Sequence, residues 1–480
     1  MKLYKHQEAA LRNYDPYKKT ILFTLSLINI LLMTFLFSWF WYHFFAGTMY
    51  TYRFYRRGNY VIIGLYALFL IFFGRMYGAT KLGQLRRIEV ILSQFLSIFI
   101  SNLVTYIIIS LLAFRFINVL PVLVMTLGDF VITVLWFFGA SAVYGRIFKS
   151  WKILLIYGER PASDLVYKVE ERRDKYAISD AIHVSAGIDK IAEKVKDYEA
   201  VIIGDISAKE RNDVLKFCYA NGIRAYVIPK ISDIILMGSD RIHIFDTPFL
   251  LTKGYSLSFD QAFAKRFLDL LIAIPMLIIA SPFMLLTAAA IKLYDKGPVF
   301  YKQIRCTKNG THFEIIKFRS MIVNAEKAGG AQLAKANDSR ITPVGRFIRS
   351  TRIDELPQLF NIIKGDMSFV GPRPERPEIM AEYMENIPEF AFRLRVKAGL
   401  TGFAQIYGKY NTVPYDKLKL DLFYIENYSL WLDIKLILMT IKTILKKDST
   451  EGISSEQTTA FKEERTDNVM DVVDEIKRRN

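Results

Sequence analysis

Residues 21–45 read ILFTLSLINILLMTFLFSWFWYHFF and contain no Asp, Glu, Lys or Arg. A helix of this length crosses a bilayer, whose hydrocarbon core needs roughly 20 apolar residues. Three further apolar runs follow at 60–74, 90–114 and 117–143, and the shortest relies on Arg75 at its end to reach the headgroups. The first third of the chain therefore predicts a polytopic α-helical membrane domain of four helices, which we bound at residues 1–148.

The charges around these runs predict their orientation. Basic residues are concentrated on the N-terminal arm and on the loop after the second run, and the opposite loops hold fewer: Lys2, Lys5, Arg12, Lys18, Lys19, Arg75, Lys81, Arg86 and Arg87 against Arg53, Arg56, Arg57 and Arg115. Cytoplasmic loops carry the excess of Lys and Arg, so the N-terminus and everything after Val143 are expected in the cytoplasm. Asp129, inside the fourth run, is open to two interpretations, an intramembrane site or an interhelical contact. The contact is favoured because the runs offer no second charge as a partner.

The composition narrows the classes of function. The chain of 480 residues carries a formal net charge of +17, which suits nucleic acid, an anionic membrane surface or phosphorylated substrates. Cys218 and Cys306 lie far apart, and the five histidines are scattered. These spacings argue against a disulfide framework, a thiolate metal site and a histidine-based zinc site.

Short apolar runs alternate with polar helical segments between residues 151 and 250. Strands are expected at 152–157, 181–184, 200–203 and 225–228, with amphipathic helices such as 188–196 and 208–220 between them. This alternation is typical of βαβ units in a small parallel sheet. The loop after the first strand, Tyr157-Gly158-Glu159-Arg160, lacks the GxGxxG of a dinucleotide site. We therefore predict an α/β Rossmann-like cytoplasmic domain at 149–255, without the glycine-rich loop and with a structural or regulatory role.

A fifth apolar run, residues 270–291, is interrupted by Pro275 and by the pair Ser281-Pro282. Both flanks are basic, with Lys265 and Arg266 before the run and Lys292, Lys296, Lys302 and Arg305 after it. An internal proline kinks a helix, and a spanning helix would place one basic flank outside. These observations favour a re-entrant hairpin, helix–break–helix, at 267–292. An ordinary kinked fifth span is the alternative.

Two adjacent carboxylates, Asp354 and Glu355, make their segment the leading candidate for a catalytic site. Asp354-Glu355-Leu356-Pro357-Gln358 leads into an apolar stretch that stops at Gly365, which predicts a helix with Asp354 or a neighbour at its N-cap. One carboxylate there could attack phosphorus while the other holds a divalent cation. Plain capping of the helix is the alternative, because acids are common in first turns.

Cations gather around this segment. Arg346, Arg349 and Arg352 are spaced to share one helix face, which indicates either a bound anion or contact with lipid headgroups. Arg373 lies in the stiff loop Gly371-Pro372-Arg373-Pro374, which suits a phosphate grip but also an ordinary turn. Lys317 and Arg319 flank Phe318 in KFRSM, a segment that is equally readable as a strand with a charged face. Together these features indicate an anionic substrate and metal-assisted phosphoryl chemistry at a membrane face, rather than nucleic acid.

The chain from Lys265 to Lys446 resembles the bacterial sugar transferase family, the polyprenyl-phosphate hexose-1-phosphate transferases. The motifs that carry the resemblance are KRFLD at 265–269, GPVF at 297–300, KFRSM at 317–321, TPVGR at 342–346, DELPQ at 354–358, GDMSFVGPRP at 365–374, GLTG at 399–402 and WLD at 431–433. The four N-terminal runs and the α/β segment resemble the long form of that family. The resemblance implies an α-rich catalytic domain at 262–447, followed by a polar C-terminal tail at 448–480 that is either a mobile appendage or a contact helix.

The resemblance also implies roles for individual residues. Asp354 would attack the sugar-linked phosphate of a UDP-sugar and release UMP, and Glu355 would hold Mg²⁺. Lys317, Arg319, Arg352 and Arg373 would grip phosphates, and Ser281 and Pro282 would form the break in the hairpin. Arg352-Ile353 departs from the small polar residue and leucine expected before the dyad, which makes Arg352 the least secure of these grips.

The reaction implied is the transfer of a hexose 1-phosphate to undecaprenyl phosphate at the bacterial inner membrane. It would be the first step of exopolysaccharide, capsule or O-antigen synthesis, with glucose or galactose preferred by analogy and a homodimer plausible. Two alternatives stay open. One is a membrane-anchored nucleotide-sugar epimerase or dehydratase, against which the missing glycine loop argues. The other is a non-enzymatic regulator of polysaccharide export.

Overall fold

A computed structural model describes residues 16–48, 56–148, 150–158, 162–254, 256–323, 340–408, 412–445 and 469–478. The chain forms two compact units, Met1–Ile228 with Glu464–Asn480, and Pro229–Glu463. The described residues are mostly helical and include five helices long and apolar enough to cross a membrane.

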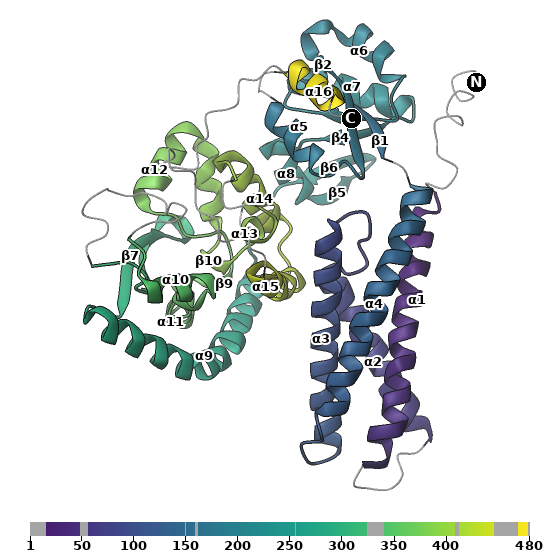
Figure 1. Ribbon diagram of the computed structural model, residues 1–480. Helices are drawn as coiled ribbons and strands as arrows, with labels where there is room; N and C mark the ends of the chain where they lie inside the picture. The colour runs from purple at the N-terminus through teal and green to yellow at the C-terminus, as the bar shows by residue number, and fades with distance from the viewer. Residues whose placement is uncertain are drawn as a thin grey trace. The chain divides into compact units, whose positions relative to one another are not determined.

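The four predicted membrane helices are present in the first unit, where they lie side by side (Figure 1). They are α1 (Lys18–Phe40, continued by a π-helical turn, Trp41–Phe45), α2 (Arg56–Tyr77), α3 (Arg87–Leu112) and α4 (Leu120–Ile147). Large apolar side chains such as Phe35 and Leu135 remain exposed, as expected of helices whose solvent is lipid. Inside the bundle, Phe37 stacks on Tyr66 with ring centroids 4.2 Å apart.

Asp129 lies inside this bundle and is fully buried. Its Oδ2 accepts hydrogen bonds from the Tyr66 hydroxyl at 3.1 Å and from the Asn102 side-chain amide at 3.0 Å. The carboxyl group therefore joins α4 to α2 and α3. This geometry is the interhelical contact that the sequence favoured.

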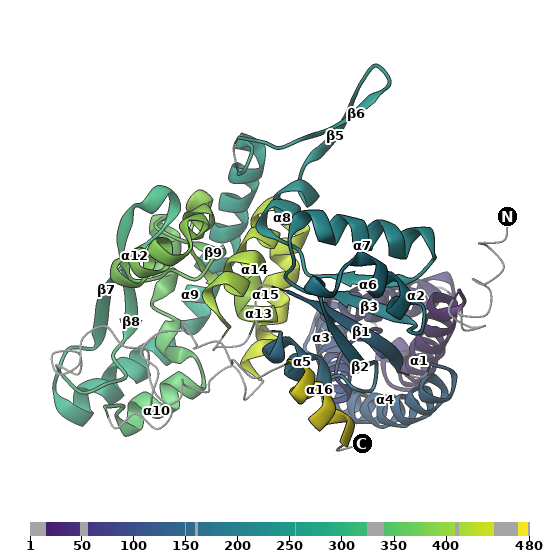
Figure 2. The same cartoon turned by 90° about the horizontal axis from the view of Figure 1, so that it is seen from above.

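The predicted parallel sheet follows in the same unit, in the order β2-β1-β3-β4 (Figure 2). Its strands are β1 (Trp151–Tyr157), β2 (Tyr176–His183), β3 (Ala200–Ile203) and β4 (Arg224–Val227), all paired in parallel; β2 begins earlier than expected. Helices α5 (Ser163–Glu170), α6 (Ile188–Val195) and α7 (Ala208–Ala220) cover it. Alternate residues of β1 pack into two cores, one on each face. Glu159 and Arg160 of the glycine-poor loop lie outside the described residues, so the likeness to a dinucleotide fold stays a prediction.

The C-terminal tail contributes a helix to this sheet. Helix α16 (Val469–Arg478) buries Val469, Val472 and Val473 in the core shared with β1 and α5. Of the two roles left open for the tail, the described part has that of a contact helix.

The boundary between the units differs from the one expected at residue 255. Helix α8 (Ile231–Met237) places Ile231 and Ile234 in the same core as Leu418 and Leu422 of the second unit. The antiparallel hairpin β5 (Asp240–Ile244) and β6 (Thr247–Leu251) belongs to that unit as well. By packing, the α/β domain ends at Ile228 because the next helix buries its apolar side chains elsewhere.

The second unit is built on one long helix, α9 (Phe259–Asp295), that runs through Pro275 and Pro282 without an interruption and is visibly bent (Figure 1). The helix is therefore not interrupted at Ser281-Pro282, where the break was expected. The unit continues with a hairpin of β7 (Phe300–Cys306) and β8 (His312–Phe318), the helices α10 (Pro343–Ser350) and α11 (Gln358–Lys364), and the parallel pair β9 (Ser368–Val370) and β10 (Gly399–Thr401). Its other helices are α12 (Pro377–Asn386), a 3₁₀ helix (Pro388–Arg395), α13 (Phe403–Tyr407), α14 (Pro414–Glu426) and α15 (Leu430–Ile444).

Both halves of α9 pack on this unit. In the first half, Ala273 lies in the main core. In the second half, Met284 and Ile291 pack against Phe318 and Ile348. The middle of the helix leaves Ile278, Ile279, Phe283, Leu285 and Leu286 exposed. The two ends of an apolar helix are thus held by one unit.

Candidate active site

The carboxylate pair lies in a tight turn between two helices. Helix α10 ends at Ser350, Arg352 adopts a left-handed conformation with φ 60°, and Ile353–Glu355 form a 3₁₀ turn. Helix α11 begins only at Gln358, after Pro357 at its N-cap, so the expectation that Asp354 or a neighbour would cap it fails by a few residues. The predicted stop at Gly365 is confirmed, and its φ of 99° suits glycine.

Glu355 is held by two cations from distant segments. Its Oε1 accepts hydrogen bonds from Lys317 Nζ at 3.1 Å and from Arg373 Nη2 at 3.3 Å. Burial by itself would raise the pKa of this carboxyl. Lys317, Arg373 and Arg352 outweigh burial and hold the pKa well below its usual range. Glu355 is therefore a fixed negative charge.

Asp354 has the opposite electrostatics. Its Oδ1 is buried and has no hydrogen-bond partner among the described residues. Burial, followed by the neighbouring Glu355 charge, raises the pKa of Asp354 to about 6. A carboxylate with an unsolvated oxygen is a stronger nucleophile than one saturated with donors. The two acids, adjacent in sequence, are thus driven apart in pKa by their surroundings, a pattern that marks functional sites.

The predicted phosphate grips divide into two groups. Lys317 and Arg373 meet on Glu355, and the charge of Arg352 lowers the pKa of both acids. Arg319 is instead buried and pairs with Asp295, the last residue of α9. The predicted row of Arg346, Arg349 and Arg352 does not form one helix face, because α10 ends before Arg352.

Glycines explain how the motif loops approach so closely. A Cβ on Gly371 would lie 2.3 Å from the Lys397 carbonyl oxygen, and one on Gly345 would lie 1.9 Å from that of Ser320. Any larger residue would separate these backbones. Gly371 therefore brings the Arg373 loop against β10, and Gly345 brings α10 against Ser320, just after the strand that carries Lys317.

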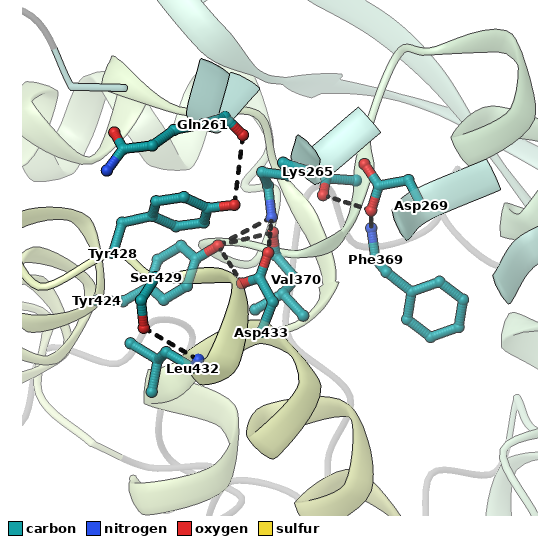
Figure 3. Close-up of polar contacts among 11 residues, drawn as sticks. Gln261, Lys265, Asp269, Phe369, Val370, Tyr424, Tyr428, Ser429, Leu432 and Asp433 are labelled. Atoms are coloured by element: carbon teal, nitrogen blue, oxygen red, sulfur yellow. Dashed lines mark hydrogen bonds and ion pairs between the residues drawn. The ribbon is translucent and has the colours of Figure 1, made fainter. Parts of the chain in front are cut away.

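A second polar cluster, absent from the predicted site, joins α9 to the core (Figure 3). We call Lys265, Asp269, Tyr424 and Asp433 the anchor cluster. Lys265 Nζ donates to Asp433 Oδ2 at 2.7 Å and to the Tyr424 hydroxyl at 2.9 Å, while Asp269 Oδ1 accepts from the Phe369 N–H at 2.9 Å. All four side chains are buried. The KRFLD and WLD motifs contain the charged residues of this cluster. The sequence alone did not indicate that these charges contact each other.

The carboxylate pair is the candidate place for Mg²⁺ in this site. Within the described ranges no group of three or more His, Cys, Asp or Glu could form a complete metal cage. Mg²⁺, however, is commonly held by one or two carboxylates, with substrate phosphates and waters as its other ligands. The carboxylate of Glu355, which Lys317 and Arg373 both contact through Oε1, fits that pattern.

The fold and the site define a membrane-associated protein with a cation-held carboxylate pair beside an apolar helix. A family model described as bacterial sugar transferase matches residues 260–447. A UDP-glucose:undecaprenyl-phosphate glucose-1-phosphate transferase from Caulobacter vibrioides is 40% identical over 190 residues, which are 38% of this chain and 71% of that protein. The chain therefore belongs to the bacterial sugar transferase family.

Longer relatives match over a smaller share of their length. A UDP-N-acetylgalactosamine-undecaprenyl-phosphate N-acetylgalactosaminephosphotransferase from Aeromonas hydrophila is 40% identical over 256 residues, 52% of this chain and 59% of that protein. An undecaprenyl-phosphate galactose phosphotransferase from Salmonella typhimurium is 36% identical over 239 residues, 46% of this chain and 49% of that protein. The match thus spans about half the length of these relatives.

Proposed function

We propose that this chain is a phosphoglycosyltransferase that moves a hexose 1-phosphate from a UDP-sugar to undecaprenyl phosphate. The observation that carries the proposal is the unpartnered Oδ1 of Asp354, next to a Glu355 that is held ionised by Lys317 and Arg373. Relatives named for this type of transfer support it.

The reaction proceeds in two displacements at one phosphorus atom. Asp354 Oδ1 attacks the sugar-linked phosphorus of the UDP-sugar, the bond from that phosphorus to the bridging oxygen breaks, and UMP leaves with the electron pair. A phosphate oxygen of undecaprenyl phosphate then attacks the same phosphorus and releases the Asp354 carboxylate. Lys317 and Arg373 offset the charge of the diphosphate, with Arg352 beside them.

Glu355 is the residue that would hold Mg²⁺, which leaves Asp354 Oδ1 for the attack. When bound, the ion would neutralise charge on the diphosphate. Lys317 and Arg373 both contact Glu355 through Oε1, and these two contacts orient the carboxylate.

The bent helix α9 fits a hairpin that enters and leaves the membrane on one side. A straight helix of 37 residues would be about 55 Å long, well beyond the roughly 30 Å hydrocarbon core. Both of its ends are instead bonded to the same unit, through Lys265 and Asp433 at one end and Asp295 and Arg319 at the other. We place that unit in the cytoplasm, at the inner membrane.

The names of the relatives support a class of sugar donor and a class of pathway. The relatives are named for glucose, galactose and N-acetylgalactosamine transfer. We propose a UDP-hexose donor and the first step of exopolysaccharide, capsule or O-antigen synthesis. A homodimer stays a prediction.

The decisive experiment uses the full chain in lipid nanodiscs with Mg²⁺ and a panel of UDP-sugars, without undecaprenyl phosphate. The expected result is a burst of about one UMP per protein, with a hexose phosphate added to the peptide that contains Asp354. Glu314→Gln, which removes an exposed carboxylate on β8 paired with Lys302, is the matched control and should keep the burst. An adduct on another side chain would contradict the mechanism.

A further inference from the structure

The backbone of the Arg373 loop is held by a buried side chain that the proposed reaction does not use. Arg393, from the 3₁₀ helix, is 2% exposed, and its Nη2 donates to the Arg373 carbonyl oxygen at 3.0 Å. Its Nε donates to Asp421 Oδ2 at 2.9 Å, and its Nη1 lies 3.6 Å from Glu375 Oε1. One planar guanidinium thus ties the loop to two buried carboxylates.

Successive carbonyls of this loop all have a donor. The Pro372 oxygen accepts from Gly399 N–H at 2.9 Å, the Arg373 oxygen from Arg393, the Pro374 oxygen from Arg305 Nη1 at 3.2 Å, and the Glu375 oxygen from Cys306 N–H at 3.0 Å. Two prolines restrict φ within the same stretch. The Arg373 carbonyl belongs to the residue whose side chain reaches Glu355. Of these four hydrogen bonds, the one from Arg393 therefore fixes the backbone of the residue that contacts the site.

The side chains around Arg393 are charged and buried. Asp421 is 1% exposed and Glu375 is 8% exposed. Burial by itself would raise the pKa of Glu375, yet Lys417 and Arg393 lower it to about 2. Buried ion pairs of this kind give little net stability compared with apolar residues, because desolvation offsets their attraction. Their advantage lies in fixing one geometry, which here is that of the Arg373 loop.

We propose that Arg393 is a positioning residue, which with Asp421 and Glu375 fixes the Arg373 carbonyl and so holds the Arg373 guanidinium at Glu355 and the substrate phosphate. The inference rests on the proposed sugar-phosphate transfer and adds a residue to its machinery. A lysine at position 393 keeps the positive charge between the acids. It replaces the planar fork with one ammonium group, so it cannot reproduce the separate contacts of Nε with Asp421, of Nη1 with Glu375 and of Nη2 with the Arg373 carbonyl at once.

The test is a double-mutant cycle in the full chain with Arg393→Lys, Arg373→Lys and both together, read as kcat/KM for UMP release. Each single variant should lose about tenfold or more, since a misplaced phosphate grip weakens transition-state binding. The double variant should fall no further than Arg373→Lys alone, because Arg393 acts through Arg373. Losses that multiply in the double variant overturn the proposal.

A second measurement does not depend on activity. Hydrogen–deuterium exchange of the peptide covering residues 369–376 should be faster in Arg393→Lys than in the parent chain, and unchanged exchange overturns the proposal. Arg395→Lys is the matched control, because Arg395 lies on the same 3₁₀ helix and faces Glu426 at 3.6 Å. It should alter neither exchange nor kcat/KM. A parent chain that releases no UMP from any UDP-sugar would defeat the proposed function, and the exchange result would still decide the role of Arg393.

Discussion

Two charged clusters in the second unit both place carboxylates beside a lysine but differ in how those carboxylates are hydrogen-bonded. In the anchor cluster, Asp433 accepts from Lys265 through one oxygen and from Tyr424 through the other. In the candidate site, Glu355 takes the hydrogen bonds of both Lys317 and Arg373, while Oδ1 of Asp354 has none among the described residues.

The difference teaches how to tell a structural acid from a reactive one. A buried carboxyl group whose oxygens are all bonded resists any change of partner, so it fixes packing. A carboxyl group left short of donors beside a fixed negative charge is held in an unfavourable state that a substrate or cation can relieve. Removing the two kinds of acid should therefore have opposite effects on stability and activity.

The largest effect is expected for Asp354→Asn, which should lower UMP release at least about a thousandfold, as loss of a nucleophile does elsewhere. The variant should not lower the unfolding midpoint at pH 7. The pKa of Asp354 is about 6, raised by burial above the ordinary value for an aspartate. The ionised group therefore destabilises the fold above pH 6, and neutral asparagine removes that cost. Activity assays and thermal unfolding measured side by side would check both parts. A stability loss comparable to that of an anchor variant would erase the contrast.

Lys265→Met should have the next largest effect, on stability. It leaves Asp433 buried without its cation, which costs about 3–5 kcal/mol. Chemical denaturation of the full chain in nanodiscs would measure the loss. Adding Asp433→Leu should recover part of it, because no unpaired charge is then buried; a double variant as unstable as the single one would show that the pair is not the cause.

Lys317→Met should reduce kcat/KM for UMP release about 10- to 100-fold, because Lys317 is the closest cation to Glu355. Lys302→Met on the adjacent strand β7 is the matched control, since Lys302 is exposed and its ion pair is with Glu314, which is exposed as well. The control should stay within about twofold. Equal losses in both variants would indicate a general effect of charge.

The smallest effect is a shift with pH. Because Asp354 must be ionised to attack and its pKa is about 6, kcat/KM should fall up to tenfold per unit below about pH 6. Lys317 lowers the pKa of Asp354, so Lys317→Met should move this limb to higher pH. pH–rate profiles of the parent chain and of Lys317→Met would measure this shift. An acid limb at the same pH in both proteins would show that it does not report the ionisation of Asp354.

Several features of the molecule were readable from the sequence. The four N-terminal helices followed from uncharged runs, and the parallel sheet followed from strands alternating with amphipathic helices. The stop at Gly365 followed from glycine chemistry. These features depend on local composition and periodicity, which the chain carries in each segment by itself.

Other features came only from tertiary packing. Position in the chain did not show that α8 joins the second unit, that Arg319 pairs with Asp295, or that α9 bends without breaking. The motifs identified Asp354 and Glu355 together, yet only the fold sets their pKa values apart. Burial and the Glu355 charge raise the pKa of Asp354, whereas Lys317 and Arg373 lower that of Glu355.

Local sequence is enough to assign the class of each segment and to identify the residues able to do chemistry. Which charges meet depends on the folded chain as a whole. The physical reason is that apolar periodicity acts over neighbouring residues, whereas the energy of a buried charge depends on every partner and every water that the whole fold places around it.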